Sequence, residues 1–259
     1  MIEQAPRAEA VTALRRGIDA GMTHIDTAEM YGSGASEDCV GEAIAGRRHD
    51  VFIVSKVLPS NATKAGTIAA CERTLKRLKI ESLDCYLLHW PSSHPLEGTI
   101  AAFETLRRDG KIRSWGLSNF DVTDLKQAHA ISPNIACNQV LYHLNQRAIE
   151  HEVVPWCKAH NIAVVAYSPF GQAHGFPAAR SKGGQILEQI GRQHRATPRQ
   201  VALAWLTREP GTFAIPKAAS LGHVLENAKA GDLKLTPAEC ASIDDAFPLG
   251  RKPRQLPMI

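Results

Sequence analysis

Segments with helical periodicity alternate with short β-rich runs along almost the whole chain. Strands that are separated by helices pair in parallel, because each helix carries the chain back across one face of the sheet. The pattern predicts an α/β fold, a (β/α)8 TIM barrel with about seven of the eight strands present, as a single domain over residues 1–259. The expected strands are 24–27, 51–57, 83–89, 112–117, 136–140, 162–168 and 212–216. The expected helices are 7–20, 36–46, 63–78, 96–108, 122–131, 149–160, two segments around Pro198 after a loop at 170–184, 221–230, and one after Thr236.

The composition argues against several classes of partner. Thirty Lys and Arg residues face 26 Asp and Glu residues, and the basic residues are scattered, so we expect no nucleic-acid surface. No run approaches the length of about 18 apolar residues typical of a membrane helix, and the first residues lack the apolar core of a signal peptide. We therefore expect a cytoplasmic protein without a membrane anchor. The six cysteines form no Cys-x-x-Cys pair, so reduced thiols and no metal site are predicted.

Four residues with complementary chemistry stand where predicted strands end. Asp26 and Tyr31 lie in Thr-His-Ile-Asp-Thr-Ala-Glu-Met-Tyr-Gly, Lys56 ends Phe-Ile-Val-Ser-Lys, and His89 follows Leu-Asp-Cys-Tyr-Leu-Leu. The carboxyl ends of parallel barrel strands converge on one rim, which predicts a proton-donating site. Tyr31 is the expected acid, Lys56 is expected to lower its pKa, and Asp26 is expected to hold Lys56. His89 is expected to donate a hydrogen bond to a substrate oxygen.

Each of these residues also has a structural interpretation. Asp26 alone would cap a turn, Tyr31 would be an edge aromatic, and Lys56 would be a solvated strand end. His89 beside Trp90 would be a core histidine. Taken together, four matching residues at strand ends favour the catalytic interpretation. Glu29, within the first motif, is interpreted as a solvated loop residue.

These motifs, with Gly-Leu-Ser-Asn-Phe at 116–120 and Ile-Pro-Lys at 215–217, resemble the aldo-keto reductases, from about residue 5 to the C-terminus. The resemblance implies NADPH-dependent reduction of aldehydes or ketones, with Tyr31 as proton donor. No Gly-x-Gly-x-x-Gly motif opens a helix, so the cofactor is not expected on a Rossmann-type turn. The implied nicotinamide contacts are Ser118, Asn119, Gln139 and Tyr167, and the implied pyrophosphate contacts are Ser168, Phe170 and Gly171.

The segment from Ile215 to Asn227 resembles the family's adenosine-phosphate site. The resemblance implies Lys217 and His223 beside the 2′-phosphate, and Glu226 and Asn227 beside adenine. A serine is common after the lysine and an arginine is common at the position of His223; this chain has Ala218 and His223. A mostly neutral histidine cannot form the bidentate fork of an arginine, so NADPH is expected with NADH as an alternative.

The resemblance also implies a class of substrate and a comparison for the N-terminal region. Trp90 and Phe120 are expected to wall a small apolar pocket, and the short tail resembles bacterial members that reduce small or aromatic aldehydes such as methylglyoxal. We expect a monomer. The family's N-terminal hairpin and first barrel strand are not recognised here, which we interpret as a late-assigned start or a truncation. The alternatives are a cofactor-binding regulatory subunit on the same barrel and an inactive fragment.

Overall fold

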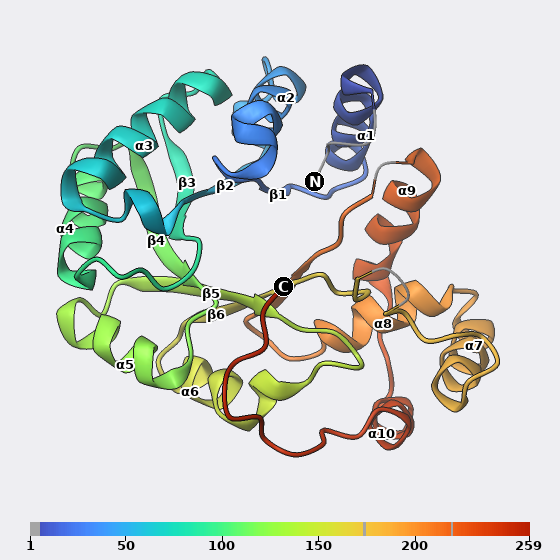
Figure 1. The fold of residues 1–259 in the computed structure, drawn as a ribbon. Coiled ribbons are helices and arrows are strands. Elements are labelled where there is room, and N and C mark those ends of the chain that lie inside the picture. The colour runs from blue at the N-terminus through green and yellow to red at the C-terminus, as the bar shows by residue number, and fades with distance from the viewer. Residues whose placement is uncertain (1–5, 173–174, 219) are drawn as a thin grey trace. The chain divides into compact units, whose positions relative to one another are not determined.

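The computed structural model describes residues 6–172, 175–218 and 220–259. Within these residues seven strands follow one another in the sheet in the order in which they occur in the chain (Figure 1). Helices separate them, as the alternating sequence pattern predicted. The strands are β1 (His24–Asp26), β2 (Phe52–Val57), β3 (Leu83–Leu88), β4 (Ile112–Ser118), β5 (Ile135–Leu141), β6 (Ala163–Tyr167) and β7 (Thr212–Ile215).

The described residues divide into two compact units. Unit 1 comprises residues 6–138 and 220–221, and unit 2 comprises residues 139–172, 175–218 and 222–259. The helices of unit 1 are α1 (Arg7–Asp19), α2 (Ala35–Ala43), α3 (Lys64–Leu78), α4 (Leu96–Arg108) and α5 (Val122–Ile131). Those of unit 2 are α6 (Val153–Ala159), α7 (Lys182–His194), α8 (Pro198–Leu206), α9 (Leu221–Lys229, whose first residue belongs to unit 1) and α10 (Pro237–Ala246).

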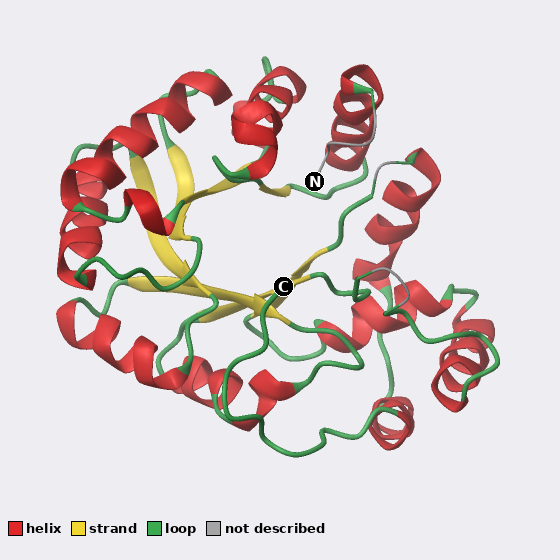
Figure 2. Cartoon of the chain, in the orientation of Figure 1, coloured by secondary structure: helices red, strands yellow, loops and turns green. Residues whose placement is uncertain are grey.

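In unit 1, strands β1 to β4 pair in parallel, and α2, α3 and α4 lie along their outer side (Figures 1 and 2). All six residues of β3 are buried, as expected for a strand covered on both faces. Phe103 of α4 stacks on Trp115 of β4 with ring centroids 5.5 Å apart, and it meets Tyr86 of β3 edge-on at 5.8 Å. Each such aromatic pair contributes about 0.5–1.5 kcal/mol beyond the area it buries. This packing fixes the strands whose ends carry the site.

In unit 2, β6 and β7 pair in parallel and α7 packs against α8 and α10. Arg147 is 8% exposed and connects the start of this unit to its last helix. Its guanidinium pairs with Glu150 and Asp244 and donates to the backbone oxygen of Phe247 at 2.6 Å. The guanidinium also lies 4.8 Å from the ring centroid of Trp205. Nothing in the sequence singled out Arg147.

Two expected element boundaries were wrong. The helix expected at 149–160 is a 3-10 turn (Ala148–His151) followed by α6, with Glu152 between them at φ −142°. Pro155 has no N–H to donate, so it fits only in the first turn of a helix, and α6 must begin close before it. The loop expected at 170–184 ends earlier, because the Ser181 side chain accepts from the Gly184 N–H and starts α7 at Lys182.

Candidate active site

The predicted catalytic residues come from neighbouring strand ends of unit 1. Asp26 is the last residue of β1, Lys56 is the next-to-last residue of β2, and His89 directly follows β3. Because the strands are parallel and in register, with Lys56 beside Leu87 of β3, these residues lie at one edge of the sheet. Tyr31 opens the 3-10 turn that follows β1. The structure therefore brings all four residues together.

Lys56 is the centre of this group and is completely buried. Its ammonium forms an ion pair with Asp26, donates to the backbone oxygen of Thr27 at 3.0 Å, and lies 3.4 Å from the Tyr31 hydroxyl. An ammonium has three hydrogens to donate, and these three partners account for all of them. The Lys56 Nζ atom also lies 5.0 Å from the centroid of the Tyr31 ring. The interpretation of Lys56 as a solvated strand end is therefore wrong.

Burial and charge set the protonation states of this pair. Burial lowers the pKa of Lys56, but the attraction of Asp26 and Tyr31 outweighs it, so this pKa lies above its usual value. Burial raises the pKa of Tyr31, and although the Lys56 charge lowers it, the net direction is upward. The expected lowering of the Tyr31 pKa by Lys56 is present, but desolvation of the phenolate is the larger effect, and the sequence did not reveal it. Tyr31 carries its proton at neutral pH, as an acid must.

His89 supplies a neutral imidazole next to the tyrosine. Burial, followed by the Lys56 charge, lowers the pKa of His89 to about 3. Its ring meets the Tyr31 ring edge-on at 5.6 Å and lies 4.8 Å from the Trp90 ring. Within the part of the chain that the structure describes, the buried Nδ1 atom of His89 has no hydrogen-bond partner. A buried orphaned ring nitrogen is available to a bound molecule.

Ser118 is the last residue of β4, and Asn119 follows it and bonds both Ser118 and the backbone of His89. The Asn119 amide donates to the backbone oxygen of His89 at 3.1 Å and to the Ser118 hydroxyl at 3.2 Å. Asn119 has φ 63°, a left-handed conformation that is uncommon outside glycine and recurs at functional sites. Phe120, expected in a pocket wall, is only 2% exposed, and its backbone N–H and C=O both bond the Asn138 side chain. Its role as a pocket wall stays a prediction.

Glu29 is the residue of unit 1 that the sequence interpretation missed. It was assigned as a solvated loop residue, but it is only 7% exposed. Its carboxylate accepts from the Leu58 N–H at 2.8 Å and from the Asn61 amide at 2.9 Å, and it lies 3.5 Å from the Arg73 guanidinium. Its neighbourhood is built from residues about thirty positions further along the chain, so no local pattern could reveal it.

The residues predicted to bind the nicotinamide in unit 2 lie in β5 and β6, and those predicted to bind the pyrophosphate follow β6. Gln139 lies in β5 and is buried, and Tyr167 ends β6. Ser168 has φ 48°, and its backbone oxygen accepts from the Gly171 N–H at 2.8 Å, so the chain turns sharply here. A Cβ on Gly171 would lie 2.9 Å from the Cα of Gly175, which is too close for another residue type. This turn leaves backbone close to the surface, where a pyrophosphate can approach.

Phe170 has a partner that the sequence did not reveal. The guanidinium of Arg199, in the first turn of α8, lies 4.7 Å from the Phe170 ring centroid and 4.6 Å from that of Phe176. The two rings meet edge-on at 5.8 Å. Arg199 thus contacts both aromatic rings by cation–π interactions. Arg199 lies nearly thirty residues from Phe170 in the chain, so only the fold indicates this pairing.

The predicted adenosine residues lie on and before α9. Lys217 and His223 are exposed, as groups that bind a phosphate from solvent should be. The Glu226 carboxylate accepts from the Thr197 hydroxyl, and its backbone oxygen accepts from the Gln200 amide at 2.8 Å. Asn227 is 6% exposed, and its amide nitrogen has no hydrogen-bond partner among the described residues. Ala219, in the same segment, lies outside the described residues.

Each unit, taken by itself, has one predicted contact at which a buried polar atom lacks a hydrogen-bond partner among the described residues. In unit 1 this is the His89 ring nitrogen, at the predicted substrate contact, and in unit 2 it is the Asn227 amide, at the predicted adenine contact. An adenine would supply the acceptor that the Asn227 amide lacks. Asn119 and Ser168 add two strained backbone positions at predicted contacts.

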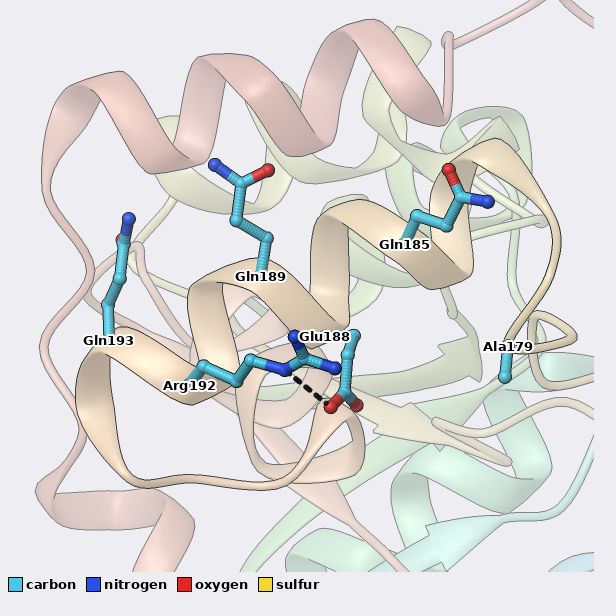
Figure 3. A pocket seen from close by; sticks show the side chains of 6 residues that line it. All are labelled: Ala179, Gln185, Glu188, Gln189, Arg192 and Gln193. Atoms are coloured by element: carbon cyan, nitrogen blue, oxygen red, sulfur yellow. Dashed lines mark hydrogen bonds and ion pairs between the residues drawn. The ribbon is translucent and has the colours of Figure 1, made fainter.

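A surface hollow in unit 2 does not belong to this set. It has a volume of about 850 Å³ and lies along α7 (Figure 3). In Figure 3 Arg192 and Glu188 are joined by an ion pair, at 3.1 Å, and glutamine side chains and Ala179 line the rest. None of its lining residues is a predicted contact. They are Ala179, Gln185, Glu188, Gln189, Arg192 and Gln193.

The described residues contain neither a candidate metal site nor a candidate membrane span. No group of three or more His, Cys, Asp or Glu side chains there is placed to hold a metal ion. Likewise, no helix in the described ranges has the length and apolar character needed to cross a membrane.

Comparison with known proteins places the chain in context. The model of the "Aldo/keto reductase family" matches residues 2–247. A methylglyoxal reductase, YeaE, of Escherichia coli K12 is 44% identical over 259 residues, which cover 99% of this chain and 91% of the relative. A glyoxal reductase of Bacillus subtilis is 34% identical, over 91% of this chain and 83% of the relative. A crystal structure of an aldo-keto reductase from Klebsiella pneumoniae in complex with NADPH is 45% identical and superimposes with a TM-score of 0.92, over 98% of this chain and 89% of that one.

Proposed function

Because the chain belongs to the aldo/keto reductase family, we propose that it uses NADPH to reduce small aldehydes, with Tyr31 as the proton donor. The predicted fold class, a (β/α)8 barrel with seven strands in the described residues, and the predicted oxidoreductase class agree with these comparisons. The proposal takes residues 1–259 as one functional domain. The observation that carries the roles of the residues is the buried Lys56 ammonium, shared between Asp26, Thr27 and the Tyr31 hydroxyl.

The chemistry of the site follows from these contacts. Reduction at this site would take its hydride from a bound nicotinamide, which would supply it to the carbonyl carbon. Tyr31 then gives its hydroxyl proton to the carbonyl oxygen, and the Lys56 ammonium, 3.4 Å away, stabilises the phenolate that remains. Asp26 keeps Lys56 charged and in place. Neutral His89 donates a hydrogen bond to the same carbonyl oxygen and orients it.

Other residues of each unit would hold the cofactor and the substrate. In unit 1, Ser118 and Asn119 offer the donors and acceptors that a carboxamide needs, and Trp90 beside His89 offers an apolar wall. In unit 2, Gln139 and Tyr167 would contact the nicotinamide, and Ser168, Phe170 and Gly171 the pyrophosphate. Lys217 and His223 would face the 2′-phosphate, and Glu226 and Asn227 the adenine. With Lys217 present and His223 in place of an arginine, we expect NADPH to be preferred over NADH by a modest factor.

The substrate is proposed from the relatives. Two relatives are named methylglyoxal reductase and glyoxal reductase, and both names refer to small aldehydes with a second carbonyl group. We propose methylglyoxal as the first substrate to test, aromatic aldehydes as the second, and the cytoplasm as the site of action.

The test compares three proteins: the unmodified chain, Tyr31→Phe and Tyr86→Phe. Tyr86 is the matched control, because it is a fully buried tyrosine of unit 1 whose hydroxyl has no hydrogen-bond partner among the described residues. With methylglyoxal we expect the unmodified chain and Tyr86→Phe to consume NADPH at similar rates. Tyr31→Phe should lose about 10²–10⁴-fold in kcat, the range for general acid catalysis. NADH is measured in parallel.

Two results would contradict the proposal. If the folded chain consumes no NADPH with methylglyoxal or aromatic aldehydes, the substrate class is wrong. If Tyr31→Phe turns over as fast as Tyr86→Phe, Tyr31 is not the acid, whatever the substrate is.

A further inference from the structure

Glu29 ties the loop that carries Tyr31 to the strand that carries Lys56. Its carboxylate accepts from the N–H of Leu58, which directly follows β2, and from the Asn61 amide three residues later. Its own N–H donates to the backbone oxygen of Lys56 at 3.4 Å. One side chain and its backbone thus hold both sides of the Lys56 strand end.

The bound loop extends the connection to His89. Pro59–Asn61 form the 3-10 turn after β2, with Leu58 directly before it, and the backbone oxygen of Pro59 accepts from the Ser92 hydroxyl at 2.9 Å. Ser92 lies three residues after His89. Glu29 therefore lies in the first of the three loops that follow β1, β2 and β3, next to Tyr31, Lys56 and His89. The first loop bonds the second through Glu29, and the second bonds the third through Ser92.

The contact that these loops maintain is long for a hydrogen bond, so a small displacement would break it. The Lys56 Nζ to Tyr31 Oη distance is 3.4 Å, already at the long end for a hydrogen bond. Tyr31 lies only two residues after Glu29, in a turn in which Gly32 and Ser33 have positive φ angles. A displacement of about 1 Å at a reacting group can cost about 10²-fold in rate. A carboxylate that accepts two hydrogen bonds is well suited to limit such a displacement.

We propose that Glu29 is a positioning residue for the reduction, holding the Tyr31 loop on the Lys56 strand so that the Tyr31 hydroxyl stays in contact with the Lys56 ammonium. The inference rests on the proposed role of Tyr31 as acid. Glu29 touches neither substrate nor cofactor in this scheme and acts through Tyr31 and Lys56.

A purely structural role is the competing explanation, and the same strands offer a matched control. Asp84 is a carboxylate that is 2% exposed; it accepts from the Ile53 N–H of β2 at 2.8 Å and pairs with Arg48 and Arg113. It resembles Glu29 in burial and in bonding β2, but it binds the first residues of that strand, whereas Glu29 binds the residues after its end. Loss of Asp84 should cost stability without disturbing Tyr31.

The experiment measures kcat, KM for methylglyoxal, the pH profile of kcat, NADPH affinity by fluorescence, and the free energy of unfolding. The proteins are the unmodified chain, Glu29→Gln, Glu29→Ala, Asp84→Asn, Asp84→Ala and Tyr31→Phe. Glu29→Gln keeps an oxygen that can accept from Leu58 and Asn61, whereas Glu29→Ala removes both bonds.

We expect Glu29→Ala to lose about 10–10²-fold in kcat, with NADPH affinity changed less than about threefold, and Glu29→Gln to recover most of this loss. As the Lys56 contact loosens, its lowering effect on the pKa of Tyr31 weakens, so the alkaline limb of the kcat profile should move to higher pH. The Asp84 variants should lose stability but keep kcat and the profile.

Three outcomes would overturn the inference. One is a kcat for Glu29→Ala that matches Asp84→Ala at equal stability. Another is a loss in NADPH affinity without a change in kcat. If Glu29→Ala does not fold, Glu29→Asp replaces it: its carboxylate is one methylene shorter and cannot keep both bonds in place, so an unmodified kcat and pH profile in Glu29→Asp would decide against the inference. Tyr31→Phe separates failure of this inference from failure of the proposed role of Tyr31. If Tyr31 is not the acid, Tyr31→Phe keeps its turnover. If only the inference about Glu29 is wrong, Tyr31→Phe still loses turnover.

Discussion

Burial decides the direction of the pKa shift of Tyr31 and of His89, whereas charge decides it for Lys56. The phenol of Tyr31 lies beside an ammonium, yet its pKa is raised because burial penalises the phenolate more than Lys56 favours it. The same burial, acting with the Lys56 charge rather than against it, lowers the pKa of His89 to about 3. One buried ammonium therefore leaves a protonated acid and a neutral hydrogen-bond donor side by side.

The low pKa of His89 predicts a specific pH dependence of stability. An unfolded histidine has a pKa near 6.5, so below that pH the unfolded chain binds a proton that folded His89 does not bind until about pH 3. The free energy of unfolding should therefore fall as the pH drops below about 6.5, with His89 contributing up to about 1.4 kcal/mol per pH unit. Denaturant titrations at about pH 7 and about pH 5 should show a shallower decline for His89→Gln than for the unmodified chain.

The exposed His49, whose ring is 81% exposed, is the control for that measurement. His49→Gln should decline as steeply as the unmodified chain. Equal slopes for all three proteins would show that His89 is not held neutral in the folded state.

The first residue of a helix can be set by a few residues that are close together in the sequence. Thr197 and Thr236 each form a capping box. The threonine side chain accepts from the N–H three residues later, and the side chain of that later residue accepts from the threonine N–H. Both are followed by proline, which suits the first helical position. Where such local signals were absent, as before α6, the predicted boundary was wrong.

Thr236→Ala tests the value of the α10 capping box. Removing the hydroxyl leaves the Glu239 N–H without its acceptor and should reduce the free energy of unfolding by about 1 kcal/mol. Ser242→Ala is the control on the same helix, because its hydroxyl only donates to the Ala238 oxygen one turn back. Chemical denaturation that finds equal losses in both variants would show that the cap contributes nothing specific.

At the scale of the whole molecule, the exposed apolar side chains of the described residues bear on the oligomeric state. They include Phe52 of β2, Ile131 of α5 and Phe213 of β7, on three different elements, and the pair Leu221 and Leu225, one turn apart on α9. Scattered apolar side chains are ordinary on monomers.

We therefore predict that the protein is a monomer. Light scattering after size exclusion should give a mass near the 28.2 kDa of the chain at micromolar concentration. A mass of twice that value, independent of dilution, would contradict the prediction and direct attention to these apolar residues.

Much of the fold and site could be predicted because the signals are local. The alternation of strand and helix patterns, the family motifs and the residue types at four strand ends are each contained in about ten residues. Asp26, Tyr31, Lys56 and His89 could be named because parallel strands bring their carboxyl ends together whatever the details of packing.

The remaining properties depend on partners that are distant in sequence, and only the tertiary structure decided them. Glu29 meets Leu58 and Asn61 at separations of 29 and 32 residues, and Arg199 reaches Phe170 from α8. Desolvation is also a property of the folded environment, so the raised pKa of Tyr31 could not be read from its neighbours in the chain. Local sequence was enough to name the groups that we propose carry the chemistry, whereas their protonation and the residues that hold them in place follow from the packed structure.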